Sequence, residues 1–597
     1  MSRRLLICAV AAALLAVAAP AATAAPALPL GHAGRFLTDA QGRVVILHGY
    51  NMVNKRPPYD PTAVGFGDDD AAFLAAEGYN TVRVGVIYKA VEPSPGSYDD
   101  AYLARIASVV DTLGRHGIVS MLDFHQDLYN ETFQGEGWPD WAVQDDGLPH
   151  EPKSGFPANY LVMPALQRAF DHFWNNDPGP GGVGLQDRYA AAWRHVAERF
   201  RDDTNVLGYE LMNEPWPGTT WQSCANPAGC PAFDAVMAGF IRRSIAAIRQ
   251  VDARTLVYYE PNVLFNDGAD TNLGSTGDAH AGFAFHDYCL AAGSSGHDDP
   301  SCDQFDDLVF ANAAKHVAAT GATSLLTEFG ATDDATILTK MAARADRNLV
   351  GWQEWHYCGC SDPTTSGPGD TQAIVLDPSR PPTGSNLKTA KLGVLSRPYP
   401  QVVAGTPQSF GFDPASKRFD LRYVTTRAGG GTLAGGALTE VALPARQYPR
   451  GYDVSVAGAS VRSAAGARTL DVAACAGVRD VAVSVTAGTG RVSQTCIPPP
   501  PLGAVIHLSA SPRSTRAGRR VRYSFLARVR VAGRLRPLKG ARIRFAGRNA
   551  KTNRLGRAVI VKRFGASRRN RRYTARAFRR DLRTGRVLVR VRASRRR

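Results

Sequence analysis

Up to Tyr357 the chain contains eight short apolar runs, and segments with helical patterning lie between most of them. The runs cover residues 44–51, 80–86, 118–125, 206–214, 255–261, 282–289, 324–330 and 350–357. The helix-like segments cover residues 68–78, 99–116, 187–201, 231–252, 303–319 and 333–347. Continuous apolar runs suit parallel strands that are buried on both faces. Strand–helix alternation repeated eight times predicts an α/β fold of the (β/α)8 barrel (TIM barrel) type.

Polar or aromatic side chains end nearly every one of these runs. They are Asn51, Arg83, Asp123, His125, Asn213, Glu214, His286, Tyr288, Glu328, Trp355 and His356. In such a barrel the carboxyl ends of the strands meet at one mouth, where active sites lie. Scattered polar residues at strand ends would not give seven converging clusters. The sequence therefore predicts an active site at the mouth of the barrel.

Glu214 and Glu328 follow the fourth and seventh runs, so they are expected to face each other across that mouth. Glycoside hydrolysis needs such a pair: one carboxyl group protonates the leaving oxygen, and the other attacks the anomeric carbon or activates water. Arg83 and Tyr288 are expected to hold and orient Glu328, and Asn213 to bind a sugar 2-hydroxyl. Glu214 needs a raised pKa to act as the acid, and the like charge of Glu328 acts in that direction.

Several stretches resemble glycoside hydrolase family 5, and within it the secreted actinobacterial endoglycoceramidases. They are HGYNMVNKRPPY (48–59), DFHQDLYN (123–130), GEGWPDWA (135–142), NEPWPG (213–218) and QEWHYCGC (353–360), and the resemblance extends over about residues 30–490. It implies a retaining glycosidase that releases an intact oligosaccharide from the ceramide of glycosphingolipids, with Glu214 as acid/base and Glu328 as nucleophile. The substrate-binding set that it implies is Lys55, Arg83, His125, Asp127, Asn213, His286, Tyr288 and Trp355. The reaction requires no metal or other cofactor.

Two insertions, residues 126–186 and 262–280, lie on the side of the mouth. Long loops at a catalytic face usually shape access to the site. The first insertion holds Trp138, Trp141, Phe156, Tyr160, Leu161, Val162 and Phe173. These side chains predict either an apolar subsite for ceramide chains, along Trp138, Trp141 and Phe173, or a loop that packs its own core.

Two other functions stay open on the sequence. A β-glucosidase or cellulase-like enzyme acting on soluble β-glucans would use the same two carboxylates, with aromatic side chains lining a groove for further sugars. The alternative of another class is an inactive barrel that binds a surface. Inactive barrels usually lack a catalytic carboxylate, whereas both are present here.

The flanks of the predicted barrel segment, residues 30–396, have other compositions. Residues 1–24 have the basic start, apolar stretch and small-residue cleavage site of a signal peptide, which predicts a secreted protein. Residues 397–497 show short alternating strands and predict a β-sandwich. Residues 498–503 form a Pro-rich linker, and residues 504–597 predict a small Arg-rich β-domain.

Eight cysteines remain after the predicted signal peptide, and an even number in an exported protein favours disulfides. Short spacings suggest the pairs Cys224–Cys230, Cys289–Cys302 and Cys475–Cys496. Cys358 and Cys360 would then pair with each other. Alternatively, they pair with Cys289 and Cys302, and spacing alone does not decide between the two.

Charge is divided unevenly along the chain. The formal net charge is +17, but 32 of the 70 Lys and Arg residues and only one of the 53 acidic residues, Asp581, lie in residues 504–597. The rest of the chain therefore carries a net −14. The basic segment is expected either to hold the enzyme at anionic lipids or an anionic cell surface, or to be a solvated face. Nucleic acid is not an expected partner, because the segment has few aromatic residues and the chain is predicted to be exported.

Overall fold

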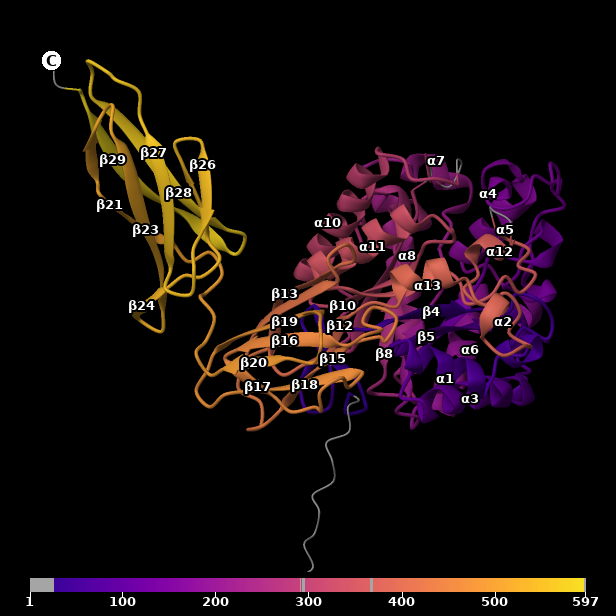
Figure 1. The fold of residues 1–597 in the computed structure, drawn as a ribbon. Helices are drawn as coiled ribbons and strands as arrows, with labels where there is room; N and C mark the ends of the chain where they lie inside the picture. Colours follow the sequence, from indigo (N-terminus) through magenta and orange to yellow (C-terminus); the bar gives the residue numbers. More distant parts are fainter. Residues whose placement is uncertain (1–25, 290, 293–295, 366–368, 595–597) are drawn as a thin grey trace, which may run out of the picture.

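A computed structural model describes residues 26–289, 291–292, 296–365 and 369–594. The predicted signal peptide, residues 1–24, lies outside the described residues. Figure 1 shows a barrel surrounded by helices, then a body made of strands, then a further β-domain at the C-terminal end. None of the described helices is both long and apolar enough to cross a membrane.

Eight parallel strands close into the predicted barrel, in the order β10-β11-β4-β5-β6-β7-β8-β9. They are β4 (His48–Met52), β5 (Thr81–Ile87), β6 (Val119–His125), β7 (Val206–Glu210), β8 (Leu256–Tyr259), β9 (Ala281–Asp287), β10 (Thr323–Phe329) and β11 (Gly351–Glu354). Nearly every residue of these strands is buried. Burial on both faces explains why the runs are continuously apolar rather than alternating.

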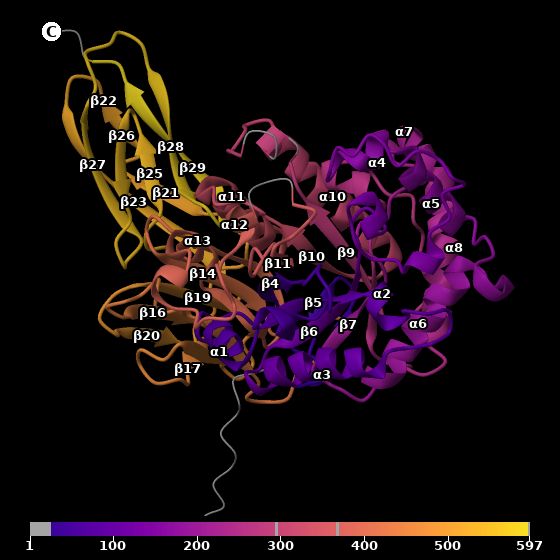
Figure 2. The same cartoon turned by 90° about the vertical axis from the view of Figure 1, so that its right-hand side faces the viewer.

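All six predicted helical segments are confirmed, and they cover the outside of the barrel (Figure 2). They form α1 (Asp68–Ala76), α3 (Asp100–Arg115), α6 (Leu185–Phe200), α8 (Pro231–Ile248), α10 (Cys302–Thr320) and α11 (Ala335–Asn348). Helix α3 begins where the Asp99 side chain accepts a hydrogen bond from Tyr102 N, and it buries Leu103, Ile106 and Val110 at helical spacing. Between β8 and β9 the described residues form only the 3-10 turn η6 (Val263–Asp267), as the Gly- and Asn-rich composition suggests.

The structure corrects the prediction for the first apolar run. Val44 and Val45 form β3, which pairs antiparallel with β12 (Tyr399–Val403), and only the second half of the run enters the barrel. Strands β1 (Gly31–Ala33) and β2 (Phe36–Thr38) join the same sheet, so the barrel does not begin at residue 30. An apolar run shows that a segment is buried, but it does not show which of two cores buries it.

The β-body consists of one 12-stranded sheet that curls over its own core. Its further strands are β13 (Thr406–Asp413), β14 (Arg418–Val424), β15 (Leu438–Ala442), β16 (Tyr452–Ala457), β17 (Ala459–Val461), β18 (Thr469–Ala474), β19 (Asp480–Ala487) and β20 (Val492–Thr495). The Tyr399 ring stacks on His48, with centroids 3.7 Å apart. Because His48 begins a barrel strand, the β-body covers the end of the barrel opposite the mouth.

The C-terminal β-domain packs two sheets over one core. One sheet holds β21 (His507–Ser511), β23 (Arg520–Val531), β24 (Arg534–Pro537) and β27 (Arg557–Arg563). The other holds β22 (Ser514–Arg516), β25 (Arg542–Phe545), β26 (Arg548–Lys551), β28 (Arg571–Arg579) and β29 (Leu582–Arg592). An ion pair of 2.8 Å between Arg422 and Asp581 joins the domain to the β-body.

Four disulfides cross-link the described residues. They are Cys224–Cys230, Cys289–Cys302, Cys358–Cys360 and Cys475–Cys496. These are the pairs that the short spacings suggested. The alternative pairing of Cys358 and Cys360 with Cys289 and Cys302 does not occur.

Candidate active site

The structure brings the two predicted catalytic glutamates together at the mouth of the barrel. Glu328 is part of β10, whereas Glu214 lies beyond β7, which ends at Glu210 and not at residue 214 as the run suggested. The backbone of Glu214 is left-handed, with φ of 43°, a conformation that is rare outside glycine and recurs at functional sites. An oxygen of each carboxylate lies within 4.8 Å of an oxygen of the other, which fits a retaining pair better than the separation of about 6.5–9.5 Å in inverting glycosidases.

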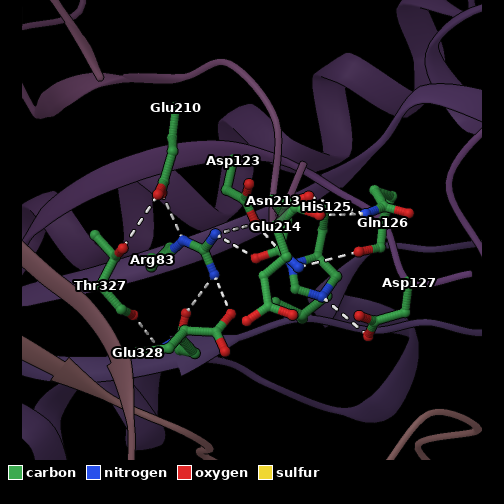
Figure 3. Close-up of polar contacts among 12 residues, drawn as sticks. Arg83, Asp123, His125, Gln126, Asp127, Glu210, Asn213, Glu214, Thr327 and Glu328 are labelled. Carbon is green, nitrogen blue, oxygen red and sulfur yellow. Dashed lines mark hydrogen bonds and ion pairs between the residues drawn. The ribbon is translucent and has the colours of Figure 1, made fainter. Parts of the chain in front are cut away.

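Arg83 lies at the centre of the polar network beneath these carboxylates (Figure 3). Its Nη1 donates to Glu328 Oε1 at 2.6 Å, and its Nε donates to Glu210 Oε2 at 2.6 Å. Its Nη2 donates to Asn213 Oδ1 at 2.8 Å and also faces Asp123. The side chain is fully buried, so Arg83 positions Glu328 and Asn213. Its predicted contact with the substrate stays a prediction.

Different groups surround the two glutamates. The Tyr288 hydroxyl donates to Glu328 Oε2 at 3.0 Å. Asn266 donates to Glu214 Oε1 at 2.7 Å, and the same oxygen lies 2.9 Å from His286 Nδ1. His286 is fully buried and supports Glu214 through this contact, and its predicted contact with the substrate stays a prediction. Burial lowers the pKa of His286 to about 4, so the ring is neutral near pH 7.

Burial is the main reason why Glu214 has an unusual pKa. It raises the pKa of Glu214 to about 7, and the negative charge of Asp127 contributes further. The like charge of Glu328, which the sequence suggested as the cause, is not among the main causes of this rise. Burial also raises the pKa of Glu328 above its ordinary value, and the adjacent Arg83 opposes that rise. Arg83 therefore favours the ionised Glu328, as predicted, but it does not bring its pKa below the ordinary range.

We expect kcat/KM to show a bell-shaped dependence on pH. Above about pH 7 Glu214 loses the proton it must donate, so kcat/KM should fall about tenfold per pH unit. On the acid side Glu328 becomes protonated, and this limb should lie above the ordinary glutamate value of 4.5. Steady-state rates on an alkyl lactoside would measure both limbs. A dinitrophenyl lactoside, whose leaving group needs no proton, should lack the basic limb, and the same basic limb on both substrates would contradict the assignment of Glu214.

A second polar group lies around Trp355. Lys55 Nζ lies 2.5 Å from Asp127 Oδ2 and 4.5 Å from the centre of the Trp355 ring. The His125 ring stacks on the same tryptophan, with centroids 5.2 Å apart. Burial lowers the pKa of His125, but the charge of neighbouring Asp123 outweighs it and raises this pKa to about 10. The structure thus brings together four of the eight predicted substrate-binding residues, Lys55, His125, Asp127 and Trp355. Their contact with sugar stays a prediction.

Several residues of the site were not predicted from the sequence. Glu260 Oε2 accepts the backbone N–H of Glu214 at 3.2 Å. Glu260 could have been predicted from the sequence, because it lies near the end of the fifth apolar run, as Glu214 does in the fourth. Gln126 Nε2 donates to Asn213 O at 2.9 Å. Asn266 lies in an insertion without strand or helix periodicity, so nothing in the sequence placed it beside Glu214.

Among the described residues, three buried groups have side-chain atoms close enough to hold a metal ion. They are His125 with Asp127 and Glu136, Glu210 with Glu260 and His286, and Glu214 with His286 and Glu328. In the first group the Lys55 ammonium already lies against Asp127. In the other two the Arg83 guanidinium already contacts Glu210, Glu260 and Glu328. A cation would compete with these charges, so the donor sets suit proton transfer better than metal binding.

The aromatic insertion packs its own core. Trp138 and Phe173 are 1% and 0% exposed, so the predicted path of ceramide chains along them is wrong. Trp141 is only partly buried, and its Nε1 donates to Glu92 O. The two most exposed large apolar side chains of this insertion lie instead on α4 (Ala158–Val162), where Leu161 is 46% and Val162 is 43% exposed.

Comparisons with known proteins agree with this geometry. A family model described as cellulase (glycosyl hydrolase family 5) matches residues 38–361, and one described as glycoside hydrolase family 5 C-terminal domain matches residues 397–486. Endoglycoceramidase I from Rhodococcus hoagii (strain 103S) is 35% identical over 461 residues, which cover 75% of this chain and 86% of that protein.

Two solved structures of endo-glycoceramidase II from Rhodococcus sp. are also similar. Its complex with ganglioside GM3 has a TM-score of 0.61 and 30% identity, and its lactosyl-enzyme intermediate has a TM-score of 0.61 and 31% identity. Each match covers 76% of this chain and 99% of the other.

Proposed function

This chain belongs to glycosyl hydrolase family 5, and from that premise we propose that it is a retaining glycosidase that releases the oligosaccharide of glycosphingolipids from ceramide. The observation that carries the proposal is the unequal pair of carboxylates. Glu214 is buried against a neutral histidine, and Glu328 is held by a cationic Arg83 and a tyrosine hydroxyl. The similarity to two endoglycoceramidases supports the choice of substrate class.

We assign a step to each carboxylate on the basis of these contacts. Protonated Glu214 donates its proton to the glycosidic oxygen while ionised Glu328 attacks the anomeric carbon and forms a glycosyl-enzyme. Ionised Glu214 then takes a proton from water, which attacks the same carbon and releases the sugar with retained configuration. Among the described contacts Asn213 Nδ2 makes one hydrogen bond, to Gln126 O, so its second hydrogen can bind a sugar 2-hydroxyl.

We propose that Leu161 and Val162 meet the lipid part of the substrate. The residue before them, Tyr160, is buried, and its hydroxyl accepts the Leu128 backbone N–H at 2.8 Å, beside the sugar-binding Asp127. Helix α4 thus joins the inner wall of the site to two exposed apolar side chains. Changing both to Ser should lower kcat/KM on micellar lactosylceramide about tenfold and leave a soluble aryl lactoside unaffected. Equal rates on the lipid would contradict this contact.

Product analysis tests the proposed reaction directly. The purified mature protein should convert lactosylceramide or a ganglioside into intact oligosaccharide plus ceramide, resolved by mass spectrometry. The Glu328→Gln variant serves as the blank. Cleavage of a cellooligosaccharide alone would keep both glutamates in their roles but would favour the β-glucan alternative. We also propose that the mature protein is secreted, which detection in the culture medium without residues 1–24 would support.

A further inference from the structure

We propose that the outer face of β25, β28 and β29 in the C-terminal β-domain binds a linear, flexible phosphate polymer. Neither family match extends beyond residue 486, and the residues from which the proposed hydrolysis is argued all lie outside this domain. For convenience we call the face formed by Arg544, Arg576, Arg586, Arg572 and Arg590 the arginine ladder.

The arginine ladder follows from the strand register. Arg544 of β25 lies opposite Arg576 of β28, and Arg576 lies opposite Arg586 of β29. These three exposed side chains form a row across adjacent strands, which are about 4.8 Å apart. Arg572 and Arg590 are also opposite each other and form a parallel row about 13 Å away, four residues along each strand.

Like charges directly opposite on neighbouring strands destabilise a sheet. The domain offers little relief, because Asp581 is its one acidic residue. Asp581 is already paired with Arg579 at 2.6 Å and with Arg422 of the β-body at 2.8 Å. In the described part of the chain no ion pair reaches the arginine ladder. An external polyanion would remove this repulsion by supplying the missing charges.

The chemistry of the face indicates which polyanion it fits. The planar guanidinium forms paired hydrogen bonds with phosphate oxygens, and two short rows of it match closely spaced charges on a chain. Single-stranded nucleic acid would need exposed aromatic side chains for its bases. Within the described domain, however, Tyr523, Phe525, Phe545 and Phe564 are buried, and Tyr573 and Phe578 are partly buried.

A lipid bilayer fits the opposite face better than the arginine ladder. On the outer face of β23 and β27, Val559 and Val561 are each 40% exposed between arginines, and such apolar side chains could enter a lipid interface. The arginine ladder has one exposed apolar neighbour, Leu588. Arg→Gln substitutions on the two faces can therefore be compared directly, because each substitution removes one positive charge from the domain.

Salt-dependent binding of the full mature chain to inorganic polyphosphate tests the proposal. The variant Arg544→Gln/Arg576→Gln/Arg586→Gln removes the three-membered row. The matched control, Arg520→Gln/Arg522→Gln/Arg557→Gln, removes three exposed arginines from the β23–β27 face. We expect the row variant to weaken binding about tenfold or more and to reduce the slope of log K against log salt by about two, as loss of three phosphate contacts predicts. The control should change both quantities clearly less.

Three results would overturn the proposal. Equal weakening in both variants would show diffuse attraction to a basic domain, without a site at the arginine ladder. Absence of polyphosphate binding, or binding only to phosphatidylglycerol vesicles, would exclude the phosphate polymer. Preference for double-stranded DNA over polyphosphate at equal phosphate concentration would point to nucleic acid. Circular-dichroism spectra and thermal unfolding transitions that match those of the unsubstituted protein would verify that both variants are folded, and the binding result does not depend on the proposed function.

Discussion

Replacing Glu328 with Gln is expected to lower kcat on lactosylceramide about a million-fold, the scale on which other hydrolases lose activity with their nucleophile. The amide of the Glu328→Gln variant cannot form the glycosyl-enzyme. Activity should therefore be lost with every substrate, whatever its leaving group. Replacing Glu214 with Gln should cost as much only where the leaving group needs a proton. With a dinitrophenyl lactoside the first step should proceed, and the glycosyl-enzyme should accumulate because no base activates water.

Mass spectrometry of the intact protein distinguishes the two roles. The Glu214→Gln variant should gain the mass of one lactosyl group after mixing with the dinitrophenyl substrate, whereas the Glu328→Gln variant should gain none. Added azide should restore turnover of the Glu214→Ala variant and give the β-configured azide, since the vacated space admits a nucleophile that needs no base. An adduct on the Glu328 variant would reverse the assignment.

Replacing Arg83 with Met is expected to be among the most destabilising single changes in the barrel. Its side chain contacts Asp123, Glu210, Glu260 and Glu328, all of which are buried. Removing one partner of a buried ion pair typically costs about 3–5 kcal/mol, because the remaining charge stays buried without compensation. Urea unfolding at pH 7 would measure the loss. Arg115→Met, which breaks an exposed pair with Asp68, should cost less than about 1 kcal/mol.

The pH dependence of the Arg83→Met variant separates lost charge from lost packing. Burial raises the pKa values of Glu260 and Glu328, and without the opposing charge of Arg83 both should rise further above those of the unfolded chain. The folded state then binds more protons than the unfolded state, so stability increases as the pH falls. The deficit relative to the unsubstituted protein should therefore shrink between pH 8 and pH 5. A deficit that is constant with pH would indicate that Arg83 acts mainly through packing.

Much of the barrel could be predicted from the sequence because its strands are buried on both faces and so form uninterrupted apolar runs. The same reasoning placed Glu214 and Glu328, since strand ends of a parallel barrel converge. It could not assign Val44 and Val45, because both cores of the molecule accept valine. Nor could it decide between a binding surface and a packed loop for Trp138 and Phe173, since aromatic side chains serve both.

Supporting residues were harder to predict than reacting ones. Glu260 could have been found, because it ends a strand as Glu214 nearly does. Asn266 lies in a turn whose conformation depends on its tertiary neighbours. The spacing of residues in the sequence therefore could not place its side chain beside Glu214. The burial that raises the pKa of Glu214 is likewise a property of the assembled mouth, whereas the charge of Glu328 was visible in the sequence and received too much weight.

The pairing of β3 with β12 also determines the order in which the molecule can be completed. Val45, near the N-terminal end of the chain, pairs with Val402, which is synthesised only after the whole barrel. The sheet therefore cannot close until the last barrel strand has emerged, and a chain cut after residue 396 would expose the unpaired edge of β3. In terms of architecture the barrel and the β-body are two domains. In terms of folding they depend on each other, because the sheet of the β-body includes β3, which precedes the barrel in the chain.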